Sequence, residues 1–293
     1  MSEIGDAITD VRRAQTWTER LYFVSPVAEA LLKQVWGVTG IGRRKAAGAN
    51  DSAAHGTDRR NAAAMAALGI DPGVARLATG PFAGMRYFTR STGSLLGPKL
   101  LGSYEEEIAP WISEALAARY DAVVDVGSAE GYYAVGFAVG SPDTAVFAYD
   151  VDPKSQEFVR ALAAENGVAG RVTIGGWCDH SELEGRLSGV DRALLIVDIE
   201  GYENGLLDPG RVPALRRTDI IVELHEHARP GVTSRLLNRF AYSHAIDVAC
   251  ARTDQSKIAA AVRSGMSQQT AQAVVPEGRR LPQLWLRMRS YPG

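Results

Sequence analysis

The chain has 293 residues, of which 46% are hydrophobic and 23% charged, so its size and composition predict a globular protein with a substantial core. Its formal charge of −2 offers no clustered positive excess for binding nucleic-acid phosphates. The apolar runs are far too short to cross a bilayer, and no secretory signal is evident at the N-terminus. Two cysteines, Cys178 and Cys250, provide neither a disulfide framework nor a CxxC metal pair. These bounds favour a soluble, cytoplasmic protein with no membrane or nucleic-acid partner.

Residues 1–102 are rich in Ala, Arg and Gly and show helical patterning. Val27–Val35 has apolar residues at helical spacing, and Thr57–Leu68 is a second predicted helix that stops at Gly69. Between them, Gly40–Gly56 is small and polar and carries three adjacent basic residues, which favours a solvated loop, with a mobile basic lid as the alternative. We therefore expect residues 1–102 to form a mainly helical appendage or lid.

From residue 103 onward, short apolar runs alternate with helical segments. Ser103 and Glu106 have the spacing of a capping box, which predicts a helix ending near Ala118. Nearly continuous apolar runs are typical of strands buried on both faces, and their alternation with helices predicts βαβ units and a parallel sheet over residues 103–293. The predicted strands are Ala122–Val126, Ala145–Tyr149, Val172–Ile174, Ala193–Val197 and Ile220–Val222, with two more at Ala245–Ala249 and Gln283–Met288.

An acidic residue stands near the carboxyl end of each of the first five predicted strands, in the strand's last residues or in the loop that follows. These acids are Asp125, Asp150, Asp179, Asp198 and Glu223, separated by 25, 29, 19 and 25 residues, each about one βα unit. The carboxyl ends of parallel strands share one edge of a sheet, and open α/β proteins bind their ligands beyond that edge. The phasing therefore predicts one ligand site assembled from all five strand ends.

The loop after the first strand indicates which ligand is bound. Gly127 and Gly131 are present, but Ala129 occupies the middle glycine position of GxGxxG, which disfavours a dinucleotide site. No GxxxxGK[ST] phosphate loop is present either. Asp125 suits a cationic amino group, and Asp150 could accept hydrogen bonds from both hydroxyls of a ribose.

The third strand end adds Asp179, which could meet an adenine edge together with the backbone near Cys178. An amino group, a ribose and an adenine on one edge describe S-adenosylmethionine. This cofactor is therefore the one that the strand ends predict.

Four segments resemble the FkbM-type class I methyltransferases. They are Asp125–Ala138 (DVGSAEGYYAVGFA), Ala148–Pro153 (AYDVDP), Val197–Leu207 (VDIEGYENGLL) and Ile220–His225 (IIVELH), and the resemblance spans roughly residues 103–250. It implies a Rossmann-like class I fold with a seven-stranded, mostly parallel sheet. It also implies that Asp198 and Glu200 lie next to the reacting methyl group.

Combining the strand-end pattern with this resemblance gives the expected cofactor contacts. The predicted cofactor-binding residues are Asp125, Gly127, Ser128, Glu130, Gly131, Tyr132, Asp150, Asp152, Cys178, Asp179 and Asp198.

A hydroxyl acceptor would need a base within hydrogen-bond reach, and four catalytic candidates follow the fourth and fifth strands: Asp198, Glu200, Glu223 and His225. Side chains two residues apart in an extended strand lie on the same face. Asp198 and Glu200 should therefore point to one side, and so should Glu223 and His225. A divalent metal held by Asp198, Glu223 and His225 is the alternative way to activate the acceptor. Three further residues, Glu277, Arg279 and Trp285, could line the acceptor pocket.

The sequence thus predicts an S-adenosylmethionine-dependent methyltransferase that acts on the hydroxyl of a small molecule, such as a sugar or natural product. An N-methyltransferase, or an enzyme acting on a peptide or protein, would use the same cofactor site. A non-catalytic scaffold that keeps the fold is the alternative from another functional class. The acids Asp125, Asp150 and Asp198 together argue against the scaffold.

Overall fold

The computed structural model describes residues 56–91, 94–279 and 283–292. The predicted helix Val27–Val35 and, apart from its last residue, the basic loop Gly40–Gly56 lie outside these ranges. Residues 56–68 form the second predicted helix, and Gly69 follows it with a left-handed φ of 65°. Among the described residues, no helix is both long and apolar enough to span a membrane.

A seven-stranded sheet of order β5-β4-β3-β6-β7-β9-β8 forms the centre of the molecule. Its strands are β3 (Ala122–Val126), β4 (Ala145–Tyr149), β5 (Val172–Gly175), β6 (Ala193–Val197), β7 (Asp219–Leu224), β8 (His244–Cys250) and β9 (Leu284–Ser290). The first five pair in parallel, whereas β9 pairs antiparallel with both β7 and β8. This order, with one antiparallel strand near one edge, is the class I methyltransferase Rossmann-like fold, and all seven predicted strands are confirmed.

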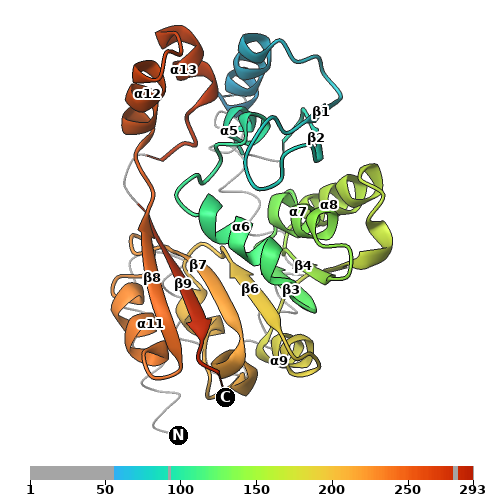
Figure 1. Ribbon diagram of the computed structural model, residues 1–293, viewed down its shortest axis with the longest axis vertical. Helices are drawn as coiled ribbons and strands as arrows, with labels where there is room; N and C mark the ends of the chain where they lie inside the picture. Colours follow the sequence, from blue (N-terminus) through green and yellow to red (C-terminus); the bar gives the residue numbers. More distant parts are fainter. Residues whose placement is uncertain (1–55, 92–93, 280–282, 293) are drawn as a thin grey trace, which may run out of the picture.

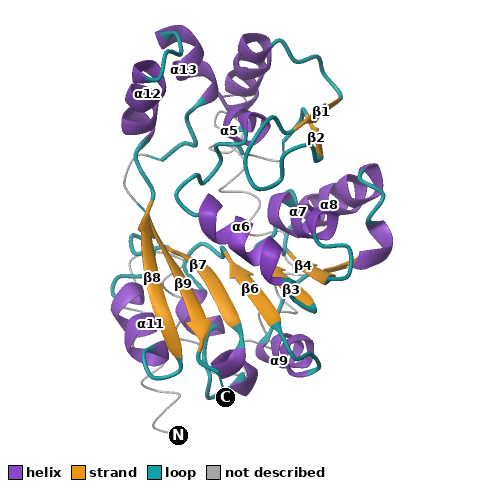
Figure 2. Ribbon diagram, viewed as in Figure 1, coloured by secondary structure: helices purple, strands orange, loops and turns teal. Residues whose placement is uncertain are grey.

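Helices cover both faces of the sheet (Figure 2). They are α6 (Ala109–Ala118), α7 (Tyr132–Gly140), α8 (Pro153–Glu165), α9 (His180–Ser188), α10 (Glu203–Leu206) and α11 (Val232–Phe240), with short 3-10 turns at Ala169–Arg171 and Pro213–Arg217. Val123 of β3 packs in one core cluster with α6, α7 and α8, and its neighbour Val124 packs in the other with α9, α10 and α11. Strands buried on both faces explain why the apolar runs do not alternate.

The predicted capping box at Ser103 is wrong. The helix that ends at Ala118 begins at Ala109, with a proline in its first turn, and residues before it form turns. The cause is Gly102, which ends the preceding helix with a φ of 86° and lies so close to Thr79 that a Cβ would come within 2.1 Å of its carbonyl oxygen. The following turn places Glu105 in a left-handed conformation, with φ of 49°.

A second group of elements lies beyond the carboxyl ends of the parallel strands, in the upper part of Figure 1. Besides helix 56–68 it contains β1 (Val74–Arg76), β2 (Arg86–Phe88), α5 (Leu96–Leu101), α12 (Asp254–Arg263) and α13 (Gln268–Val274). We call residues 56–101 and 254–279 the cap. The β1–β2 hairpin was not predicted, because strands of three residues are too short to show a period.

The two halves of the cap pack on each other and on the methyltransferase-like domain. A Cβ on Gly97 of α5 would lie 2.5 Å from the carbonyl oxygen of Val274 in α13. A Cβ on Gly136 of α7 would lie 2.6 Å from the ring of Phe82. The cap is therefore continuous with the core beneath it and overlies the edge at which the predicted site lies.

Candidate functional site

The glycine loop, residues 127–131, folds tightly against the neighbouring strand ends. Gly127 has a φ of 87°, and a Cβ there would lie 1.7 Å from the backbone oxygen of Asp198 after β6. The Gly127 N–H donates to the Tyr149 carbonyl at the end of β4, 2.9 Å away. Gly131, with φ of 81°, begins α7, and Ala129 is left-handed without being a glycine, at φ of 44°. Only a residue without a side chain fits at position 127.

Asp150 connects the second strand end to this loop. Its Oδ2 accepts from the Ala129 N–H at 2.8 Å, and its Oδ1 accepts from the Asp152 N–H at 2.8 Å. Burial raises the pKa of Asp150, while these two N–H donors lower it. Each carboxylate oxygen retains capacity for a second donor. Asp150 is therefore placed to bind a ligand hydroxyl next to the glycine loop.

Two other predicted acids serve as helix caps. The exposed Asp152 accepts from the Lys154 N–H at 3.0 Å and begins α8. Asp179 accepts from the Glu182 N–H at 2.9 Å and begins α9. Capping uses one carboxylate oxygen of each. Their role as cofactor residues stays a prediction.

Asp125 and Cys178 are more deeply buried than the sequence indicated. The Asp125 carboxylate is 2% exposed and accepts from the Ala134 N–H inside α7, at 3.0 Å. Burial raises the pKa of Asp125 to about 7 and that of Cys178 to about 12. Both side chains have little surface left for a ligand, and their cofactor contacts also stay predictions.

Three more predicted residues of this loop region are buried: Ser128, Glu130 and Tyr132. The Tyr132 ring is edge-on to Phe82 and Tyr104 in an aromatic cluster between α7 and the cap. The Glu130 carboxylate is engaged by side chains of the cap, and its nearest cation is Lys99. These residues connect the loop to the cap.

The predicted catalytic residues gather around His225, which is 1% exposed. Its Nδ1 lies 2.7 Å from Glu203 Oε1, and its Nε2 lies 3.3 Å from Glu200 Oε2 and 3.5 Å from Asp198 Oδ1. Burial lowers the pKa of His225, but the hydrogen bond and charge of Glu203, with the charges of Glu223 and Glu200, outweigh it, so the pKa is raised overall. The structure brings together all four catalytic candidates, as the sequence predicts.

Glu203 is a site residue that sequence reasoning missed. It is fully buried, and besides His225 it accepts from the Gly201 N–H at 2.8 Å. Its position at the start of α10 also favours a carboxylate, because the helix dipole is positive there. The sequence signal was that Glu203 is the second glutamate of the DIEGYE segment. A carboxylate buried there needs a hydrogen-bond partner, and the partner is His225.

Arg279 brings a positive charge from the cap into the acidic site. Its Nη1 contacts Glu223 Oε1 at 2.5 Å, its Nη2 contacts Glu105 Oε1 at 2.9 Å, and its Nε contacts Glu277 Oε2 at 2.9 Å. Of the three predicted acceptor-pocket residues, Arg279 and Glu277 thus reach the site. The third, Trp285, is buried, and its indole nitrogen has no hydrogen-bond partner among the described residues.

Negative charge in this cluster exceeds the positive charge. Burial and the neighbouring Glu223 raise the pKa of Glu105 to about 8, although Arg279 lowers it. Burial, Glu223, Glu105 and Glu200 raise the pKa of Asp198 well above its ordinary value. Asp198 Oδ1 is buried and has no hydrogen-bond partner among the described residues. The site is therefore suited to a cationic ligand, or to a proton held between carboxylates.

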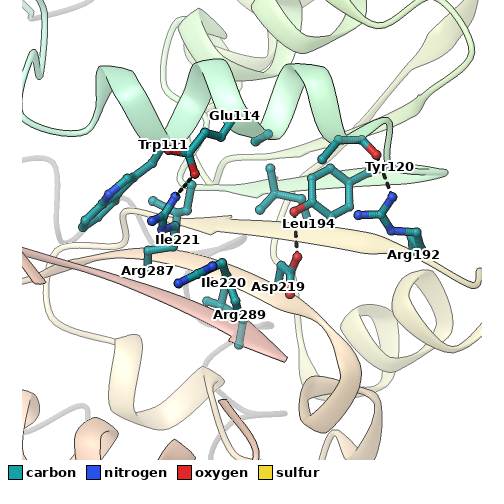
Figure 3. Close-up of a pocket in the computed structure, with 12 residues that line it drawn as sticks. Trp111, Glu114, Tyr120, Arg192, Leu194, Asp219, Ile220, Ile221, Arg287 and Arg289 are labelled. Carbon is teal, nitrogen blue, oxygen red and sulfur yellow. Dashed lines mark hydrogen bonds and ion pairs between the residues drawn. The ribbon is translucent and has the colours of Figure 1, made fainter. Parts of the chain in front are cut away.

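A cavity of about 290 Å³ lies at the opposite end of the sheet, beneath α6 (Figure 3). Asp219 at its wall is the first residue of β7, and Arg192 directly precedes β6, so the cavity is at the amino ends of the parallel strands. Two pairs of lining residues bond to each other: Tyr120 donates to Asp219 at 2.7 Å, and Arg287 pairs with Glu114. None of the predicted site residues lines it.

No protein-family model matches the chain. Solved structures similar to it include a putative O-methyltransferase from Klebsiella pneumoniae, 13% identical, covering 65% of this chain and 82% of that chain with a TM-score of 0.42. The O-methyltransferase TomG from Streptomyces achromogenes, in complex with SAM, is 14% identical, covering 60% and 77% with a TM-score of 0.40. A methyltransferase from Geobacter sulfurreducens is 17% identical, covering 61% and 75% with a TM-score of 0.39. The fold class itself follows from the strand order described above.

Proposed function

We propose that the protein is an S-adenosylmethionine-dependent methyltransferase of the FkbM type that methylates a hydroxyl group of a small molecule in the cytoplasm. The observation that carries the proposal is the contact between the glycine loop and the acidic cluster. Gly127 lies against the backbone of Asp198, so a ligand bound at the loop and Asp150 would extend directly to Asp198, Glu200 and His225.

The residues at this edge fit the cofactor chemically. Asp150 offers its carboxylate to a ribose. Asp198 Oδ1 accepts no hydrogen bond among the described residues, and a sulfonium or ammonium group beside it would favour the ionised carboxylate. Bound S-adenosylmethionine would supply a methyl group already activated for displacement. The chain's own task is then mainly to align the acceptor and remove its proton.

His225 is the base that this geometry supports best. Glu203 holds Nδ1, which leaves Nε2 directed toward Asp198 and Glu200, where an acceptor hydroxyl would lie. Nε2 of His225 would then accept the proton that the acceptor hydroxyl loses when it takes the methyl group supplied by the bound cofactor. Glu203 stabilises the imidazolium that forms, as a carboxylate behind a catalytic histidine does in hydrolases.

The excess of carboxylates favours one second candidate, a cationic amine acceptor. Glu105, Asp198 and Glu223 each place a carboxylate oxygen within 4.8 Å of the others, and Arg279 of the cap pairs with Glu105 and Glu223, so a protonated amine would be bound and deprotonated beside Asp198. A divalent ion would use Asp198, Glu200 and His225, which each offer one ligand atom. The guanidinium of Arg279 already compensates Glu223, which argues against Glu223 as a ligand of such an ion.

Calorimetry with S-adenosylmethionine, S-adenosylhomocysteine and NAD tests the cofactor. Binding of both sulfur compounds, without NAD, supports the proposal, and binding of NAD alone overturns it. Small hydroxylated and amine-containing compounds, with peptides as a third group, are then screened by mass spectrometry for gain of one methyl group. Activity that persists after exhaustive chelation excludes the metal.

A further inference from the structure

Glu130, the acid inside the glycine loop, is 1% exposed, and its carboxylate bonds to side chains of the cap. Its Oε2 lies 3.0 Å from Lys99 Nζ and accepts hydrogen bonds from Ser94 Oγ at 2.8 Å and Tyr87 OH at 3.0 Å. Its Oε1 accepts from Ser91 Oγ at 2.6 Å. Within the described part of the chain, a single side chain of the loop is thus bonded to four cap residues that sequence reasoning did not single out.

This contact is a fully desolvated ion pair. Lys99 is 3% exposed, and its Nζ also donates to Ser94 Oγ at 2.9 Å. Burial raises the pKa of Glu130, but Lys99 and the hydroxyl donors outweigh it and lower the pKa to about 2. The carboxylate is therefore ionised throughout the physiological pH range, so the charge that Lys99 pairs with is present across that range.

The partners of Glu130 are themselves fixed by other parts of the cap. The Asn61 side chain donates to the Ser94 carbonyl at 3.0 Å and accepts from the Leu96 N–H at 2.8 Å. Gly97 packs directly on Val274 of α13. Both halves of the cap thus hold α5 in place, and α5 holds Lys99.

The loop needs such support because Ala129 adopts a left-handed conformation, at φ of 44°. A residue with a Cβ is disfavoured there, and strained residues persist only where their surroundings fix them. On one side, the Ala129 N–H is bonded to Asp150, the residue predicted to bind the ribose. On the other side stands Glu130, anchored to the cap.

We propose that Glu130 is a positioning residue: through Lys99 it couples the cap to the glycine loop and so sets the affinity for the cofactor without contacting it. This inference rests on the proposed function. Loss of the Glu130 charge would release Ala129 from its strained conformation and move the N–H that orients Asp150. The loop amides and the ribose carboxylate would then no longer be preorganised for binding.

The test measures the Kd of S-adenosylhomocysteine by calorimetry for the full chain, well below each variant's melting temperature. We expect Glu130→Gln and Lys99→Met to raise the Kd by about tenfold or more, the scale on which supporting residues act on the groups that they orient. Tyr87→Phe removes one hydroxyl only and should give a smaller rise, which keeps the test valid if the other variants fold poorly. Glu165→Gln is the matched control, because Glu165 of α8 also pairs with the cap, at Arg86, but away from the loop.

A rescue variant separates positioning from general destabilisation. Ala129→Gly relieves the left-handed strain, so adding it to Glu130→Gln should recover most of the lost affinity. Hydrogen exchange provides a second readout, in which the loop amides exchange faster in Glu130→Gln than in Glu165→Gln. Wild-type binding with an unchanged Kd in Glu130→Gln and Lys99→Met overturns this inference alone. Failure of the wild type to bind either sulfur compound overturns the proposed function and this inference together.

Discussion

Glu203 Oε1 lies 2.7 Å from Nδ1 of His225, and both side chains are buried. The contact joins the start of α10 to the residue directly after β7, so it fixes the imidazole relative to two strand ends. With Nδ1 bonded to a carboxylate, Nε2 is the nitrogen left to exchange protons with a ligand.

The first prediction concerns the pH dependence that this pair sets. Because the pKa of His225 is raised, the neutral base forms only above its ordinary pKa, and the methylation rate should rise with pH through that raised value. Glu203→Gln retains a hydrogen-bond acceptor but loses the charge, so the inflection should move to lower pH. The pH–rate profile and an NMR titration of His225 measure the shift.

Glu184→Gln is the control for this prediction, since Glu184 bonds to the Ala214 N–H and not to His225. Its pH profile should match that of the wild type. An identical inflection in Glu203→Gln and the wild type would contradict the assignment of His225 as the base.

The strands and the common edge of the site were predictable because they depend on local patterns. Apolar runs buried on both faces mark β3 and β6, and the order of βα units places Asp150, Asp198 and Glu223 at one edge. The presence of Glu105 in the acidic site, and its ion pair with Arg279, were not predictable from the sequence. It reaches the site through a left-handed turn after Gly102, and its partner Arg279 stands 174 residues later. No local period reports a contact at that separation.

Glu130 is a second residue whose long-range partners could not be predicted from its neighbours in the sequence. Its position in the glycine loop predicted a cofactor contact, but the structure bonds both of its oxygens to the cap. Sequence reasoning assigned the residue from its neighbours along the chain. The partner that determines its environment, Lys99, lies in a helix that no pattern had indicated.

A second prediction concerns stability and Asp125. Its folded-state pKa of about 7 exceeds the unfolded value, so the folded protein retains a proton that the unfolded chain releases. The contribution of Asp125 to the free energy of unfolding should therefore fall as pH rises from about 4 to 7 and level off above that range. Asp125→Asn keeps an acceptor for the Ala134 N–H and cannot ionise.

This variant should be more stable than the cofactor-free wild type at pH 8, by on the order of 4 kcal/mol, and the gain should vanish as pH falls toward 4. Urea unfolding at about pH 5 and pH 8 measures both values. Asp121→Asn, at an exposed residue, is the control and should show no such pH-dependent gain. A constant difference between Asp125→Asn and wild type at both pH values would contradict the prediction.

A third prediction addresses the glycine loop. Gly127→Ala would place a Cβ 1.7 Å from the Asp198 backbone oxygen at a left-handed φ, so the loop must move away from β6. We expect binding of S-adenosylhomocysteine to be lost and the unfolding free energy to fall by about 2 kcal/mol or more. Calorimetry and thermal unfolding report the two effects.

Gly185→Ala is the matched control, because nothing lies within 4 Å of a Cβ at this position in α9. Alanine favours a helix, so this variant should be equal to or slightly more stable than the wild type. Retained cofactor binding in Gly127→Ala would show that the loop does not form the cofactor site.

A fourth prediction concerns the charge that the cap delivers to the site. Arg279→Met removes the guanidinium that contacts Glu105, Glu223 and Glu277. Because Glu277 still pairs with Lys257, the uncompensated buried charge falls mainly on Glu223, which should cost about 3–5 kcal/mol of stability near neutral pH. Because protonation removes the uncompensated charges, the deficit relative to wild type should shrink as pH falls. Adding Glu223→Gln to Arg279→Met should likewise restore part of the stability, whereas adding Glu114→Gln, at an exposed carboxylate on α6, should not. Urea unfolding of the single variant and the two double variants at two pH values measures both the pH dependence of the deficit and its dependence on Glu223. A deficit independent of pH and of Glu223 would mean that Arg279 stabilises the protein by packing, and that the acidic cluster does not depend on its charge.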